Sequence, residues 1–299
     1  MRTFKVAIWV AALLAAVLIT GCNQGSREEK GIGTTENSFE APERQAQHET
    51  TSEEGKAQRE APFTVTSKMK GGLEGAADSI HEVRFGKHEG YERAVIDFGS
   101  ESAPASRVPV WSLSRPTGEG YMRITFPDID ATSETDGIFG GSILDNFYVV
   151  RAPGRGMFVD VFATGAFRYR VMELSNPGRL VLDYHPTSVD LSFPIPARAK
   201  KTVLFEPRQG EAITSPLRVS GYSRNFEASN TITLRASSGK SLFQRTVLSN
   251  DWTETWGYFK ASLEFPAFEG LATLRVGGES PRDGSFEGVE VPVTYGGDS

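Results

Sequence analysis

Histidines and acidic residues are the side chains of this chain that could hold a metal ion. His81 and His88 each precede a glutamate, and the other two histidines are His48 and His185. Zinc sites need three or four convergent ligands, and no His-x-x-x-His spacing or Cys/His cluster accompanies these histidines. A metal site is thus one interpretation and solvated turn histidines are the simpler one. On the simpler interpretation we predict no metal ion and no other cofactor.

Few residue patterns in the chain suit catalysis. Asp128 and Asp130 could face one way on an extended chain, because alternate residues share a face. A general acid–base pair would need a cleft and a raised pKa, so solvated loop acids are the alternative. The sequence has no Gly-x-Ser-x-Gly elbow, and glycine groups such as Gly137, Gly140 and Gly141 lack a Walker lysine. We therefore expect a protein that is not an enzyme.

Arginines and a tyrosine suggest binding instead. Guanidinium forks match carboxylates, and tyrosine rings match the faces of sugars. Ordinary polar exteriors of strands would show the same residue types, so that alternative stays open. The candidate binding residues are Arg84, Tyr91, Arg93, Arg168 and Arg170.

The only cysteine, Cys22, follows an N-terminal leader. Arg2 and Lys5 precede an apolar run at 6–19, and two small residues separate this run from Cys22. This order is typical of a secretory signal peptide, and the run is shorter than the about 20 residues that cross a bilayer. The quartet Ile-Thr-Gly-Cys at 19–22 resembles the bacterial lipobox, whose cysteine receives a diacylglyceryl group before cleavage. An ordinary signal peptide with an incidental cysteine is the alternative.

The lipobox resemblance implies a location outside the cytoplasm. Residues 1–21 would be removed, and lipid on Cys22 would anchor the protein to the bacterial cell membrane. Loss of the leader, which has two basic residues and no acidic ones, takes the formal net charge from −6 to about −8. Nucleic acid favours a basic face, so we expect no nucleic-acid partner.

Residues 22–78 are predicted to form a disordered tether. The stretch 23–61 is rich in Glu, Gln, Gly, Ser and Thr, and Phe39 is almost its only large apolar residue. Such a segment buries too little apolar surface to offset the entropy of ordering it. The tether would act as a spacer between the membrane and the folded part.

Short alternating segments begin at about residue 79 and predict β-strands. In 91–98, Ala94, Ile96 and Phe98 alternate with more polar residues, and 157–162 and 167–171 show the same period. Strands are expected at 80–85, 91–98, 108–113, 121–126, 147–151, 157–163, 167–174 and 179–184. Frequent turn residues between short strands favour a first β-sandwich over residues 79–186.

A Pro-rich segment at 187–201, following Pro186, is predicted to be a hinge before a second module over 202–296. Seven further strands are expected at 203–205, 217–222, 231–235, 242–248, 258–265, 271–276 and 289–294. This number suits an immunoglobulin-like sandwich without the usual disulfide. Trp256, Phe259, Leu263 and Phe265 are expected in its core.

The second module resembles the immunoglobulin-like domain of bacterial spore-germination and sporulation lipoproteins. Its matching pieces are Phe-Glu-Pro at 205–207, the segment 213–221, Asn-Phe-Glu-Ala at 225–228, Ser-Gly at 238–239, Trp-Gly-Tyr-Phe at 256–259, Gly284 and Val-Pro-Val at 291–293. The resemblance implies a cell-surface module.

The first module resembles an AMIN domain. Its matching pieces are Val-Arg-Phe-Gly at 83–86, the segment 90–98, Phe-Tyr-Val-Val at 147–150, Phe-Arg-Tyr-Arg-Val at 167–171 and the segment 178–184. AMIN domains are small β-sandwiches thought to target cell-wall proteins to peptidoglycan, so a similar binding role is implied. The amidase unit that many relatives carry is missing.

Together these features predict an all-β, lipid-anchored envelope protein with two β-sandwiches, AMIN-like and then immunoglobulin-like. The expected ligand is cell-wall polymer, namely peptidoglycan. The alternative is a protein–protein interaction component of an envelope or spore-germination assembly that does not bind glycan.

Overall fold

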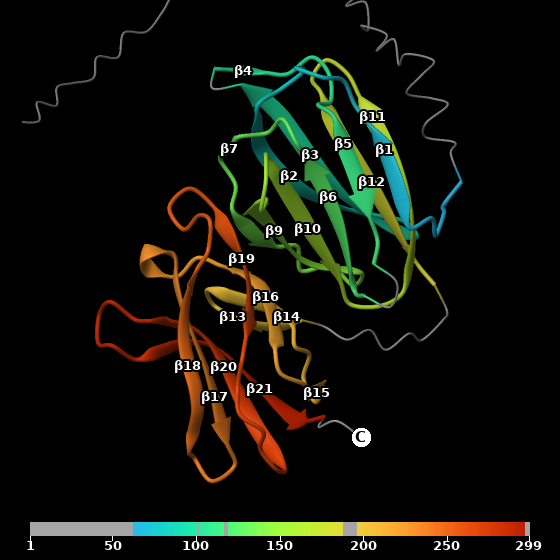
Figure 1. Ribbon diagram of the computed structural model, residues 1–299. Coiled ribbons are helices and arrows are strands. Elements are labelled where there is room, and N and C mark those ends of the chain that lie inside the picture. The colour runs from blue at the N-terminus through green and yellow to red at the C-terminus, as the bar shows by residue number, and fades with distance from the viewer. Residues whose placement is uncertain (1–61, 101, 117–118, 188–195, 297–299) are drawn as a thin grey trace, which may run out of the picture. The chain divides into compact units, whose positions relative to one another are not determined.

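The computed structural model describes residues 62–100, 102–116, 119–187 and 196–296, and these are almost entirely β-structure (Figure 1). The described part contains one short helical segment, the 3-10 turn η1 (Phe226–Ala228). The predicted all-β fold is therefore confirmed. The predictions for the leader, Cys22, the tether up to residue 61 and hinge residues 188–195 lie outside the described residues.

Within the described residues, the first sandwich has twelve strands in two layers. They are β1 (Lys68–Gly71), β2 (Ser79–His88), β3 (Tyr91–Ser100), β4 (Ala103–Pro104), β5 (Trp111–Ser114), β6 (Tyr121–Phe126), β7 (Ala131–Thr132), β8 (Asp136–Ile138), β9 (Leu144–Arg151), β10 (Met157–Ala163), β11 (Phe167–Leu174) and β12 (Arg179–Pro186). One layer has the order β11-β12-β3-β2-β7, with β4 beside β3, and the other has β1-β5-β6-β10-β9, with β8 beside β9.

The core of the first sandwich follows the predicted alternation. Ala94, Ile96 and Phe98 of β3 face inward, and they share a cluster with Val159 and Val161 of β10. The opposite face of β10 is also buried, because Phe158 and Phe162 belong to a separate aromatic cluster. A strand buried on both faces must contact a second layer on each side.

The other nine strands in the described part of the chain form the second sandwich. They are β13 (Ala197–Ala199), β14 (Thr202–Glu206), β15 (Ala212–Ile213), β16 (Leu217–Ser223), β17 (Ser229–Ala236), β18 (Ser241–Leu248), β19 (Trp256–Leu263), β20 (Leu271–Glu279) and β21 (Phe286–Tyr295). Strands β13-β14-β16-β19 form one layer and β15-β21-β20-β17-β18 the other. Phe259 and Phe265 lie in its core and Leu263 packs against that core, as expected.

Trp256 departs from this expectation, because it lies in the aromatic cluster between the two sandwiches. Its ring centroid lies 4.8 Å from that of Tyr148 and 5.8 Å from that of Tyr222. Here β19 pairs in parallel with β9, Trp256 opposite Val150 and Gly257 opposite Arg151, so one sheet continues through both sandwiches. We call this region the junction.

Gly257 permits the close approach of the loop that precedes β19. A Cβ atom there would lie only 2.1 Å from the carbonyl oxygen of Asp251. Polar contacts reinforce the pairing, since the Thr255 hydroxyl donates to the Val149 carbonyl oxygen (2.5 Å) and Arg198 pairs with Asp145 (2.9 Å). Side chains of the second sandwich thus bind backbone and carboxylates of the first.

Two segments differ from the sequence prediction. The predicted tether extends too far, because Thr64 exchanges backbone hydrogen bonds with Tyr169 and β1 pairs with β5. Met69 is the only large apolar residue of β1, so the hydrophobic content of this segment gave little sign of a strand. Within the predicted hinge, Ala197–Ala199 forms β13 and pairs with β14.

The described residues contain no helix that is long and apolar enough to cross a membrane.

Candidate functional site

The predicted binding arginines lie on the outer face of the first sandwich, where most have carboxylate partners. Arg84 forms a two-point pair with Asp97 (2.6 and 2.8 Å), and this hydrogen bonding raises the pKa of Arg84. Arg93 forms a similar pair with Asp183 (2.6 and 2.9 Å), whose carboxylate raises the pKa of Arg93. Arg170 binds the same carboxylate at 2.8 Å. These guanidinium forks are already engaged within the chain.

Tyr91 joins two of these arginines. The guanidinium carbons of Arg93 and Arg170 lie 5.5 Å and 5.3 Å from its ring centroid. Arg84 of β2 pairs instead with Asp97 of β3, and Arg168 is exposed on the edge strand β11. The structure therefore brings together Tyr91, Arg93 and Arg170 around the fully buried Asp183 side chain. Their role as a binding site stays a prediction.

The described histidines and Asp128 each contact a different partner. His81 Nε2 lies 2.8 Å from the Ser100 carbonyl oxygen, and His88 stacks on Tyr91 with ring centroids 4.6 Å apart. His185 Nδ1 lies 2.7 Å from the Pro186 carbonyl oxygen. Asp128 pairs with Arg155 at 2.9 Å. Across the described residues, no group of three His, Cys, Asp or Glu side chains could hold a metal ion.

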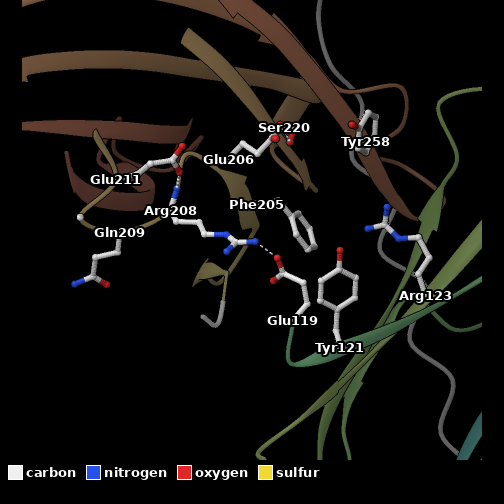
Figure 2. A pocket seen from close by; sticks show the side chains of 11 residues that line it. Glu119, Tyr121, Arg123, Phe205, Glu206, Arg208, Gln209, Glu211, Ser220 and Tyr258 are labelled. Carbon is white, nitrogen blue, oxygen red and sulfur yellow. Dashed lines mark hydrogen bonds and ion pairs between the residues drawn. The ribbon is translucent and has the colours of Figure 1, made fainter. Parts of the chain in front are cut away.

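A groove of about 730 Å³ opens beside the junction, and strands of both sandwiches line it (Figure 2). β6 supplies Tyr121 and Arg123, which alternate around the core residue Met122 and so share a face. Phe205 of β14 and Tyr258 of β19 come from the second sandwich. Figure 2 shows the three aromatic rings and the guanidinium of Arg123 grouped in one place.

Arg123 and Asp160 hold one side of the groove in place. They are register partners on β6 and β10, and the guanidinium binds both carboxylate oxygens at 2.7 Å. Burial opposes the charge of Arg123, but Asp160 outweighs burial and raises the pKa of Arg123. The Arg123 guanidinium also lies 3.9 Å from the ring centroid of Phe158. It is therefore a fixed, permanently charged donor at the groove.

The opposite part of the groove is held by Arg208. Its guanidinium forms an ion pair with Glu119 of the first sandwich, and its backbone N–H donates to the Glu211 carboxylate at 2.7 Å (Figure 2). The Ser220 hydroxyl donates to Glu206 at 2.8 Å. The groove thus presents carboxylates and guanidinium groups together.

Its tyrosines remain neutral hydrogen-bonding groups near neutral pH. Burial and the charge of Asp160 raise the pKa of Tyr121 to about 12. Burial also raises the pKa of Tyr258, which is half-exposed. Each ring therefore offers an apolar face together with a hydroxyl.

This chemistry suits binding. The described residues that line the groove include no histidine or cysteine, and their one serine, Ser220, hydrogen-bonds a solvent-exposed carboxylate. Aromatic rings with mixed charges can hold a ligand that combines apolar faces, hydroxyls and ionised groups.

Sequence reasoning missed this groove because its residues come from distant parts of the chain. One signal was present: β6 and β10 carry large side chains on both faces, which indicates burial on both sides. That pattern pointed to a second contact surface without identifying the partner strands.

Comparison with known proteins identifies part of the second sandwich. Residues 202–285 match the family described as the immunoglobulin-like domain of bacterial spore germination. The match runs from β14 through β20. No curated protein and no solved structure matches the chain. The AMIN resemblance of the first module stays a prediction. The resemblance predicted for the second module is confirmed, and residues 202–285 are similar to the immunoglobulin-like domain of bacterial spore germination.

Proposed function

We propose that this chain is a non-catalytic protein of the bacterial cell envelope. It binds cell-wall polymer, namely peptidoglycan, in the groove beside the junction. The observation that carries this proposal is the grouping of Tyr121, Phe205 and Tyr258 with Arg123 and Arg208 in one open groove. Aromatic faces can pack on sugar rings, and guanidinium groups can bind carboxylates.

The mixed charge of the groove supports this ligand. Peptidoglycan combines sugar rings with peptide stems that carry both carboxylates and ammonium groups. Glu206 and Glu211 are exposed at the groove and can accept hydrogen bonds from ammonium groups, while the arginines can donate to carboxylates.

Location at the membrane belongs to the same proposal. The lipobox-like sequence ending at Cys22 would place lipid on this residue, outside the cytoplasm. The tether that follows would let the folded part reach the wall. The match of residues 202–285 to a spore-germination domain supports an envelope role.

Co-sedimentation with purified cell-wall sacculi tests wall binding. The form that begins at residue 22, carrying Cys22→Ser, should pellet saturably. Tyr258→Ala should weaken pelleting roughly 5–30-fold, because loss of a central aromatic contact costs about 1–2 kcal/mol. Near-UV circular dichroism checks that the variant is folded.

Tyr91→Ala is the matched control, since Tyr91 is a tyrosine of the outer face and lies outside the groove. It should pellet like the parent. Loss of pelleting in Tyr91→Ala with normal pelleting of Tyr258→Ala would move the site to the predicted arginine face. Absence of pelleting for the parent at every salt concentration would refute wall binding.

A second candidate function is protein docking, and β18 is the observation that favours it. β18 is the last strand of its sheet, and Leu248 at its end is 67% exposed. Unpaired strand edges are templates for addition of a partner strand. A photo-crosslinker at Arg245 should then give one discrete adduct in cells, which Leu248→Lys should abolish. A crosslinking pattern that is unchanged by Leu248→Lys would refute docking at this edge.

A further inference from the structure

A second hollow, of about 360 Å³, lies apart from the groove and shares none of its lining residues. Its apolar part consists largely of Phe226, Trp252 and Trp256. Phe226 is 49% exposed and packs edge-on against Trp252, with ring centroids 5.2 Å apart. Trp256 is buried, and its indole N–H donates to Asp136 at 3.0 Å. We call this feature the tryptophan hollow.

Three cations, Lys200, Lys201 and Arg224, line the tryptophan hollow, and two of them have no carboxylate partner among the described residues. Lys201 pairs with Glu287 at 3.0 Å. Among the described residues, the Arg224 guanidinium donates to two neutral oxygens, the Thr135 hydroxyl (3.0 Å) and the Thr253 carbonyl (3.2 Å). Lys200 is exposed.

One carboxylate, that of Asp136, also lines the tryptophan hollow. Its Oδ1 already accepts hydrogen bonds from Trp256 Nε1 and, at 2.8 Å, from the Thr135 hydroxyl. Arg224 and Lys200, which have no carboxylate partner among the described residues, therefore outnumber the carboxylate of Asp136, and the tryptophan hollow should attract anions. This differs from the groove, where Arg123 and Arg208 both have carboxylate partners.

We propose that the tryptophan hollow binds an acidic saccharide. The sugar ring packs on Phe226 and Trp252, and its anionic group pairs with Arg224 and Lys200. Aromatic side chains provide the apolar platform, and the guanidinium provides a charge-assisted hydrogen bond. This site goes beyond the proposed wall binding in the groove and does not depend on it.

Intrinsic tryptophan fluorescence tests this site in the form that begins at residue 22 and carries Cys22→Ser. The probes are hexagalacturonate, its full methyl ester, which keeps the rings and removes the charges, and acetate, which supplies the anion alone. Hexagalacturonate should change the fluorescence saturably, and added salt should weaken its binding. The ester should bind about tenfold or more weakly than hexagalacturonate because it cannot form the charged hydrogen bonds. Acetate should bind about tenfold or more weakly because it has no ring to contact the aromatic side chains.

Variants locate the binding. Arg224→Gln and Trp252→Leu should each weaken hexagalacturonate binding about tenfold. Lys200→Gln should weaken it too, and folding should not interfere because Lys200 is exposed. Arg235→Gln, an exposed arginine of β17 outside the hollow, and Tyr258→Ala in the groove should bind like the parent.

Several results would overturn the proposal. They are equal binding of the acid and its ester, no binding of hexagalacturonate at millimolar concentration, and full affinity in both Arg224→Gln and Lys200→Gln. Equal binding of acetate would also overturn it. Loss of sacculus pelleting in Tyr258→Ala with normal hexagalacturonate binding would separate this site from the groove.

Discussion

Glu92 offers a sharp test of how the first sandwich is held together. This β3 side chain belongs to a residue that is only 4% exposed, yet it is a carboxylate. Its Oε1 accepts from the backbone N–H and the hydroxyl of Ser142 (2.7 and 2.9 Å), and its Oε2 from the N–H groups of Ile143 and Leu144 (2.9 and 2.8 Å). Glu92 therefore fixes the segment that leads into β9.

Glu92→Gln keeps the shape and replaces one oxygen by an NH2 group. The NH2 group then faces either the two Ser142 donors or the buried N–H groups of Ile143 and Leu144, and that pair loses its acceptor. Each unsatisfied buried donor costs about 1–3 kcal/mol, so the free energy of unfolding should fall by about 2–6 kcal/mol. Urea titration measures this loss, and faster amide exchange at Ile143 and Leu144 would locate it. The exposed Glu89→Gln is the control and should change stability by less than about 0.5 kcal/mol.

The loss should also depend on pH. Burial alone would raise the pKa of Glu92, but the backbone donors of Leu144, Ser142 and Ile143, together with the Ser142 hydroxyl, outweigh burial and lower this pKa below 4.5. A lowered pKa contributes stability above the unfolded-state pKa and loses it as pH falls through the folded-state pKa. Since glutamine does not titrate, the difference between parent and variant should shrink from about pH 7 to about pH 3.

Two outcomes would refute this reasoning. One is a loss below about 0.5 kcal/mol at neutral pH, within the range of ordinary surface substitutions. The other is an equal loss at acidic and neutral pH, which would mean that the carboxylate charge contributes nothing.

Three further predictions concern the groove, the junction and the anchor. Asp160→Asn should cost about 3–5 kcal/mol in urea titration, because Arg123 loses its buried partner; a loss no larger than that of Asp145→Asn would contradict this. Trp256→Ala should cost about 3–5 kcal/mol and split calorimetric unfolding into two transitions, and a single unshifted transition would count against a stabilising junction. Cys22→Ser should prevent incorporation of labelled fatty acid and release the protein from the membrane fraction, whereas retained label would exclude Cys22 as the anchor.

Much of the fold could be predicted from the sequence because the strands have a period of two. The strands expected at 121–126, 157–163 and 167–174 coincide with β6, β10 and β11. The inward set of Ala94, Ile96 and Phe98 was also predicted correctly. Alternation is a local property of the sequence, so it can be recognised without knowing which strands pair.

The arginines on the outer face of the first sandwich show what a local sequence pattern cannot predict. The sequence identified Arg93 and Arg170, but it could not show that both bind Asp183, which lies far along the chain from Arg93. The pairing with a buried carboxylate gives Arg93 and Arg170 a structural role that the local sequence does not show. Strand pairing between β3, β12 and β11 makes that difference.

The sequence by itself determined the all-β class, the position of most strands and the resemblance of the second module to a spore-germination domain, since each depends on a local pattern of residues. Only the tertiary structure decided that β19 pairs with β9, that Trp256 fills a junction, and that Tyr121 and Tyr258 share a groove. These contacts join residues far apart in sequence. Their formation depends on which faces remain apolar after each sandwich has closed, and that follows from packing of the whole chain.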